Sequence, residues 1–206
     1  MVNILHIDSS PRADRSHSRE LSKEFVSSWK AAHPEDAIAY RDLGHQPVPH
    51  VDEAWIAAAF SPPETHTPEL TQALRISEEL VDEFLGADRY VFGVPMYNFN
   101  IPSTFKAYID QIVRINRTVA IEAQGFRGLV EGKKAVIITA RGGDFSPTSP
   151  FIAYDFQEPY LRTIFGFIGL TDIQFINANS MNNSDDARTQ SLSEARAAIQ
   201  DAIAQW

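Results

Sequence analysis

Hydrophobic positions follow two different periods along most of this chain. Short apolar runs predict buried strands, and they alternate with segments whose apolar residues recur every three or four positions, as on one face of a helix. Strands are expected at residues 2–7, 37–43, 88–94, 135–139 and 171–178. Helices are expected from Ser16 or Ser18 to about 33, over 67–85, from Pro102 to about 113, over 157–166, and around Leu192 to Ile203.

Strands and helices therefore alternate five times, which predicts an α/β fold with a parallel sheet covered by helices on both faces. We expect one domain over residues 1–206, a doubly wound five-stranded sheet with the flavodoxin-like order 2-1-3-4-5. Two segments do not fit the alternation. Residues 44–68 contain five prolines and predict an irregular excursion of the kind found in lids or interfaces, and 116–132 has no clear pattern.

The stretch VFGVPMYNFNIPSTFKAYID, residues 91–110, is the most unusual in composition. Pro95 ends the apolar strand because proline has no N–H for the ladder, and Pro102 suits the first turn of a helix. The loop between them is too apolar for a solvated connection and too rich in amides for a core strand. A loop at the carboxyl end of a strand is where open α/β sheets bind ligands.

Three such loops, 9–18, 95–102 and 140–144, follow the first, third and fourth strands and surround one crevice in this order. Hydroxyls of Ser10, Ser16 and Ser18, with the free N–H groups of a helix start, suit a phosphate without any lysine. No GxGxxG motif occurs, and GLVEGKK from Gly128 is one residue short of a Walker motif and precedes a strand. A monophosphate is therefore favoured over a pyrophosphate or triphosphate.

The other two loops suit a flat ring. Met96, Tyr97 and Phe99 offer a polarizable wall, and Asn98 offers hydrogen-bonding groups at its edge. The pair Gly142–Gly143 lets the main chain approach a planar ligand closely, because neither residue has a Cβ. A planar heterocycle with a terminal phosphate fits this inventory, and FMN is the common molecule of that shape.

Composition excludes several other functions. The formal net charge of −9, without a basic cluster, argues against nucleic acid or an anionic membrane as a partner. Because there is no cysteine, thiolate catalysis, disulfides and Cys-ligated metals are excluded. The six histidines have no spacing suited to a metal, so none is expected. The sequence has no signal-peptide pattern and no apolar stretch of membrane-spanning length, and a cytoplasmic location is expected.

The chain resembles the FMN-dependent NADH-azoreductases, a flavodoxin-like family related to the NAD(P)H quinone reductases. The resemblance runs through SSPRADRSHSRELS, PMYNFNIPSTFKAYID, GLVEGKKAVIITARGG and PYLRTIFGFIGLTD. It implies a homodimer with one FMN per subunit that uses NADH or NADPH to reduce quinones and azo compounds by ping-pong two-electron hydride transfer. No side chain is expected to act as a general acid. The implied cofactor contacts come from Ser10, Ser16, His17, Ser18, Met96, Tyr97, Asn98, Phe99, Ala140, Arg141, Gly142 and Gly143.

Two departures from the family pattern concern this site. Ala140 stands where a small hydroxyl residue is usual, so one hydrogen bond to the cofactor is expected to be either absent or taken over by the backbone. An aromatic residue is typical near Val119, in the segment that lines the substrate side, so the departure bears on substrate preference.

Other interpretations stay open at this point. The fold also suits a one-electron carrier or a redox-sensing flavoprotein, although the long excursion favours a dimeric enzyme. A phosphoacceptor domain built on Asp8 is weakly supported, because no acidic pair follows the first strand. His6 is expected as a satisfied core histidine and His17 as an exposed or phosphate-adjacent residue. Lys106 and Asp110 are expected as a surface pair, with Asp110 as a brace of the flavin loop the alternative. The phenylalanines at 145, 151 and 156 suit either core packing or a substrate wall.

Overall fold

The computed structural model describes residues 1–206 and contains the expected five-stranded parallel sheet. Its strands are β1 (Asn3–Asp8), β2 (Ala37–Asp42), β3 (Arg89–Pro95), β6 (Lys134–Ala140) and β7 (Asp172–Ala178). They lie in the order β2-β1-β3-β6-β7, and every pair is parallel. The predicted order 2-1-3-4-5 is therefore confirmed.

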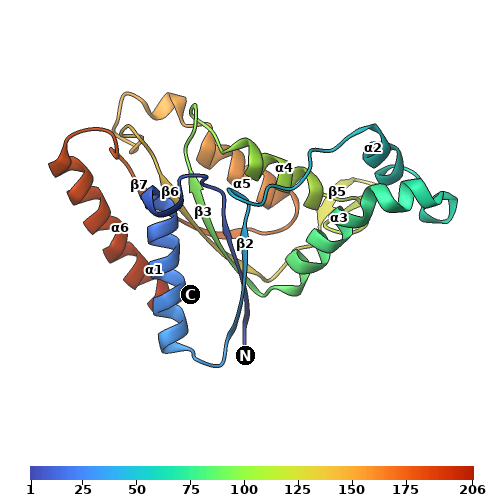
Figure 1. The fold of residues 1–206 in the computed structure, drawn as a ribbon, viewed down its shortest axis with the longest axis horizontal. Coiled ribbons are helices and arrows are strands. Elements are labelled where there is room, and N and C mark those ends of the chain that lie inside the picture. The colour runs from blue at the N-terminus through green and yellow to red at the C-terminus, as the bar shows by residue number, and fades with distance from the viewer.

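Helices cover both faces of the sheet (Figure 1). On one face lie α1 (His17–Ala32) and α6 (Asp185–Gln205), and on the other lie α3 (Pro68–Gly86), α4 (Ser103–Ile112) and α5 (Gln157–Phe167). Since β3 and β6 are buried on both sides, their sequences are nearly continuous apolar runs. None of the helices combines the length and apolar character needed to cross a bilayer.

Each face of the sheet has its own hydrophobic core. Under α1 and α6, the helical stripe of Leu21, Phe25 and Trp29 is buried as expected. Under the other helices, Phe92 of β3 stacks on Phe165 of α5 with ring centroids 5.1 Å apart. The two cores fix the positions of the strand ends, where the ligand site was expected.

The helix starts differ slightly from expectation. Ser16 is the N-cap of α1, and its hydroxyl accepts from the Arg19 N–H at 3.5 Å. Ser18 is therefore inside the first turn and does not cap it. Pro102 is the N-cap of α4, one position before the predicted first turn, and its carbonyl accepts from the N–H groups of Phe105 and Lys106.

The proline-rich excursion contains a short helix, α2 (Glu53–Ala59), and a 3-10 turn at Pro63–Thr65. A side-chain contact from a distant element fixes its position: the Trp55 indole N–H donates to the Gln111 side chain at 2.8 Å. Gln111 in turn donates to the Pro49 carbonyl at 2.9 Å. The helix depends on this long-range bridge, which local periodicity does not reveal.

The patternless segment forms a hairpin of β4 (Val119–Glu122) and β5 (Gly125–Gly128), which lies toward the same end of the molecule as α2 (Figure 1). Val119 is almost fully buried in the core, so it does not line an exposed substrate face. The expected effect of the missing aromatic residue on substrate preference stays a prediction. Ile121 and Phe126 are the exposed apolar residues of the hairpin.

Candidate functional site

A cavity of about 140 Å³ lies where the three expected loops meet, at the carboxyl ends of β1, β3 and β6. The neighbouring strands β1 and β3 are followed by helices on opposite faces, so this is the switch point of the sheet. The lining residues are Ser10, Arg12, Ser16, His17, Pro95, Met96, Tyr97, Ala140, Gly142, Met181 and Asn182.

The loop after β1 supplies donors. Ser10, Ser16 and Ser18 are buried, and the hydroxyl oxygens of Ser16 and Ser18 lie 3.2 Å apart. The backbone N–H groups of His17 and Ser18 open α1 and have no acceptor within the chain. Because these donors stand at the positive end of the helix dipole, this wall favours an anion.

His17 itself is half-buried beside the cavity, and its Nδ1 lies 3.7 Å from a Glu20 carboxylate oxygen. This position agrees with a neighbour of the bound anion.

The loop after β3 is a tight turn. Tyr97 and Asn100 exchange two backbone hydrogen bonds at 2.8 and 3.0 Å, and the residues between them, Asn98 and Phe99, have φ of 48° and 70°. Positive φ at both central positions is typical of a type I′ turn, but phenylalanine rarely adopts it. Strained backbone of this kind is concentrated at ligand sites.

Met96 and Tyr97 line the cavity, whereas Asn98 and Phe99 project beyond it and are exposed. Phe99 contacts Tyr154, with ring centroids 5.5 Å apart. The wall expected from these four residues thus has two parts: Met96 and Tyr97 form an enclosed half inside the cavity, and Asn98 and Phe99 form an open half on the surface.

The loop after β6 has main-chain N–H donors that are unpaired within the chain. The carbonyl groups of Gly142 and Gly143 accept from the N–H groups of Asn182 and Ser180 at 3.0 and 2.8 Å. The N–H groups of the two glycines have no acceptor within the chain. Ala140 lines the cavity next to them, and its carbonyl accepts from the Met96 N–H at 2.9 Å.

The segment that bonds this loop follows β7, and the sequence did not predict its role. Met181 and Asn182 both line the cavity. The rule that ligands bind at carboxyl ends of strands would have found it, had the loop after the fifth strand been included.

Arg141 has a different place from the one expected of a cofactor contact. Its guanidinium is fully buried away from the cavity lining, 3.0 Å from Asp155, and its Nε donates to Gln157 at 3.1 Å. Burial lowers the pKa of Arg141, and the charges of Asp155 and Glu158 oppose that shift. Its main-chain N–H and carbonyl bond the loop after β7, so Arg141 supports the glycine loop from behind.

The structure gives the positions of several residues outside the predicted cofactor contacts. Phe145 is buried against the glycine loop and is a packing residue, whereas Phe151 and Phe156 are exposed. His6 is a buried residue of β1, as expected. Lys106 and Asp110 form the expected exposed ion pair at 2.6 Å.

Chemically, the cavity suits a ligand rich in acceptors. Unpaired N–H groups and serine hydroxyls surround it, and no carboxylate lines it. At about 140 Å³ it is smaller than the roughly 300–1,000 Å³ typical of a complete small-molecule site. Its volume suits one small group of a ligand, such as a phosphate, and the remainder of the ligand would then lie outside it, toward the exposed loop at residues 97–99.

An open parallel sheet in this order, with a phosphate-sized cavity at its switch point, defines a flavodoxin-like protein. The family model described as the flavodoxin-like fold matches residues 2–203, and the chain belongs to this family.

Within it, the chain is 89% identical over its full length, and that of the relative, to an FMN-dependent NADH:quinone oxidoreductase from Nostoc punctiforme. It is 65% identical, again over both full lengths, to FMN-dependent NADH:quinone oxidoreductase 2 from Trichormus variabilis.

Solved structures agree with these relatives. The azoreductase from Bacillus anthracis str. Sterne superimposes with a TM-score of 0.93, with 27% identity and full coverage of both chains. An FMN-dependent NADH-azoreductase from Bacillus anthracis str. Ames Ancestor, solved in complex with FMN, has a TM-score of 0.89, 27% identity and 98% coverage of each chain.

Proposed function

We propose that this protein is an FMN-dependent oxidoreductase that uses NADH to reduce quinones and azo compounds. The observation that carries the proposal is the ring of unpaired N–H donors and buried serine hydroxyls around one cavity at the switch point. The names of its relatives, NADH:quinone oxidoreductase and azoreductase, supply the donor and the two acceptor classes. They favour a two-electron reductase over a one-electron carrier.

The proposed cofactor contacts divide into two groups. Ser10, Ser16 and His17, which line the cavity, would hold the phosphate together with the free N–H groups at the start of α1 and the buried Ser18 hydroxyl behind Ser16. The loop that contains Met96, Tyr97, Asn98 and Phe99 would hold the ring, and Ala140, Gly142 and Gly143 would hold its polar edge. Arg141 serves this edge through the loop that it supports.

When bound, FMN supplies the hydride chemistry, and the protein supplies position and electrostatics. The N–H groups of Gly142 and Gly143 would donate to acceptor atoms of the ring edge and so stabilise negative charge there. They are fixed in place because the carbonyl groups of the same two peptide units, those of Arg141 and Gly142, already accept from the N–H groups of Met181 and Asn182. No catalytic acid, base or metal is required of the chain.

The assembly and location follow from the same site. We expect a homodimer, because the open half of the ring wall is flanked by exposed Phe99, Phe151 and Phe156, which a second copy would cover. We expect a single domain over residues 1–206. A cytoplasmic location is proposed because NADH is produced and consumed inside the cell.

The test is to purify the protein with added FMN and record its visible spectrum before and after anaerobic mixing with NADH. We expect flavin absorbance that NADH bleaches, and that a quinone then restores. A protein that bound FMN but kept its colour with NADH would overturn the reductase assignment.

The phosphate contacts are tested by Ser18→Ala, with Ser27→Ala on the exposed side of the same helix as the control. Ser18→Ala should weaken FMN binding about tenfold, the effect of about 1.4 kcal/mol from one hydrogen bond to a charged group. Equal binding by both variants would remove Ser18 from the site.

A further inference from the structure

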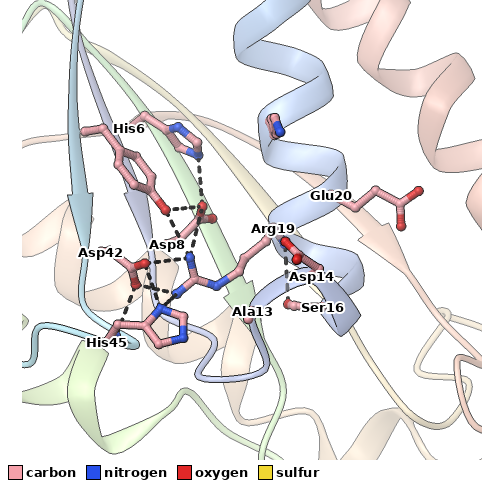
Figure 2. Close-up of a pocket in the computed structure, with 11 residues that line it drawn as sticks. His6, Asp8, Ala13, Asp14, Ser16, Arg19, Glu20, Asp42 and His45 are labelled. Atoms are coloured by element: carbon pink, nitrogen blue, oxygen red, sulfur yellow. Dashed lines mark hydrogen bonds and ion pairs between the residues drawn. The ribbon is translucent and has the colours of Figure 1, made fainter.

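A second cavity, of about 610 Å³, lies beside the proposed phosphate site, over the ends of β1 and β2 (Figure 2). Ser16 lines both cavities. The larger cavity is lined by four carboxylates, Asp8, Asp14, Glu20 and Asp42, and by two cations, Arg19 and Lys23. This excess of negative charge disfavours a second phosphate ligand. No group of His, Asp or Glu side chains suits a metal ion. Its distinctive feature is one largely buried guanidinium.

That guanidinium belongs to Arg19, in the first turn of α1. Its Nε donates to the carbonyl oxygen of Ser10 at 2.7 Å. Its two Nη atoms form a fork with the Asp42 carboxylate, and Nη1 also donates to the Tyr40 hydroxyl at 3.0 Å. Figure 2 shows the fork directed at Asp42, with Asp8 beside it, and Nη1 lies 3.8 Å from Asp8.

We propose that Arg19 is a positioning residue for the phosphate end of FMN: it holds the main chain at Ser10 so that the donors of this loop face the ligand. This inference rests on the proposed function. Arg19 lines only the larger cavity, so it acts on the phosphate through Ser10.

The Ser10 carbonyl is enclosed on its other side as well. A Cβ on Gly44 would overlap this oxygen and lie 2.6 Å from Nη2 of Arg19, so only glycine fits there. The Ser10 hydroxyl accepts from the Arg12 N–H at 3.3 Å, which leaves its own O–H free to donate. Ser10 itself is fully buried. The bonds at its carbonyl and at its hydroxyl oxygen together hold Ser10 at the wall of the smaller cavity.

The orientation of Arg19 is held by a second set of contacts around Asp8. This buried carboxylate accepts from the Ser22 hydroxyl at 2.8 Å and from the Tyr40 hydroxyl at 3.1 Å. His6 Nε2 lies 3.5 Å from it. The charge of Arg19 is therefore balanced by two carboxylates, Asp8 and Asp42. Its effect on the phosphate is geometric, and a lysine, which lacks the fork and the Nε–H, cannot reproduce it.

Riboflavin provides the discriminating comparison, because it has the same ring and side chain without the phosphate. The dissociation constants of FMN and riboflavin are measured by flavin fluorescence for the wild type and for Arg19→Lys. Lys23→Gln is the matched control, because Lys23 lies on the same helix and cavity wall but does not contact Ser10. We expect Arg19→Lys to weaken FMN binding about tenfold and to change riboflavin binding less than about twofold. Lys23→Gln should change neither.

Other outcomes overturn the proposal. Equal losses for both flavins in Arg19→Lys would indicate a general structural role, and unchanged FMN binding would remove any role. Equal effects of Arg19→Lys and Lys23→Gln would indicate long-range charge alone. A wild-type protein that bound no FMN would instead overturn the proposed function.

If Arg19→Lys does not fold, Tyr40→Phe takes its place, because Tyr40 is half exposed and its hydroxyl joins Arg19 to Asp8. A fall of about threefold in the preference for FMN over riboflavin is expected. An unchanged preference in this variant would also overturn the proposal.

Discussion

The side-chain amide nitrogen of Asn182 lies 2.7 Å from the point where a Cβ on Gly142 would stand. Asn182, in the loop after β7, therefore packs so close to Gly142 that a larger residue at position 142 would collide with it. Both residues line the cavity. This contact fixes the wall that presents the free N–H groups.

Gly142→Ala should weaken FMN binding about tenfold, because the methyl group displaces Asn182 and narrows the cavity. The unfolding free energy should fall by only about 1 kcal/mol, since the displaced atom is the end of a side chain. Flavin fluorescence titration and urea denaturation measure the two effects. In the double variant Gly142→Ala with Asn182→Ala, FMN binding should recover in part; no recovery would show that the collision with Asn182 is not the cause.

Gly93→Ala tests the packing of β3 beneath Asp8. A Cβ there would overlap the Asp8 carboxylate and lie 3.0 Å from the Ser22 hydroxyl, inside the buried sheet. We expect the unfolding free energy to fall by about 1–3 kcal/mol, as for other overpacked cores. Gly86→Ala, at the exposed end of α3 with nothing within 4 Å, is the control and should be neutral or slightly stabilising. Equal unfolding curves for the two variants would contradict this account.

Removing the cation in Arg141→Met should destabilise the fold by about 3–5 kcal/mol, because it leaves the buried Asp155 carboxylate without its partner. Arg162→Met removes an exposed pair with Glu158 on the same helix and should cost less than about 1 kcal/mol. Chemical denaturation of the two variants provides the comparison. Similar losses in both would mean that the burial of Arg141 adds little.

Asp42 should make the fold sensitive to acid. Burial alone would raise the pKa of Asp42, but hydrogen bonds from Arg19 and His45 outweigh it and hold the pKa well below its usual range. At pH values between the folded-state pKa of Asp42 and its unfolded-state pKa of about 4, the unfolded chain binds more protons than the folded chain. The stabilisation that Asp42 contributes is therefore complete above the unfolded-state pKa and is lost as the pH falls.

The measurement is the unfolding free energy from about pH 7 to about pH 3, within the range where paired carboxylates lose their contribution. Asp42→Asn should be less stable than the wild type at neutral pH but lose less stability on acidification. Asp201→Asn, on the exposed side of α6, controls for the loss of one negative charge. A wild type and Asp42→Asn with parallel pH profiles would refute the assignment.

The sequence predicts those parts of the fold that rest on local periodicity. The stripe of Leu21, Phe25 and Trp29 and the apolar run of β6 are such cases, and the sheet order follows from their alternation. The position of α2 could not be predicted, because the bridge from Trp55 to Gln111 that fixes it spans 56 positions in the sequence. No local pattern carries that information.

The same limit applies to the site. The donors around Ser16 and Gly142 could be predicted because capping serines and paired glycines follow strands directly. The burial of Arg141 could not, because an arginine beside two glycines gives no sign that Asp155 and Gln157 will enclose it. The hairpin from Val119 to Gly128 is short and has mixed polarity, so its period is not detectable.

The bonded carbonyl groups of Gly142 and Gly143 give the proposed ring edge a hydrogen-bond polarity. The oxygens of Gly142 and Gly143 already accept from the N–H groups of Asn182 and Ser180, so the unpaired main-chain groups of this wall are hydrogen-bond donors. A flavin analogue that presented an N–H group here would leave donors facing donors, and each unmatched group costs about 1–3 kcal/mol. The loop after β7 thus influences which ligand binds without contacting it through these groups. Its N–H groups occupy the carbonyl oxygens of the glycine loop, and N–H donors are what remain unpaired at the proposed ring edge.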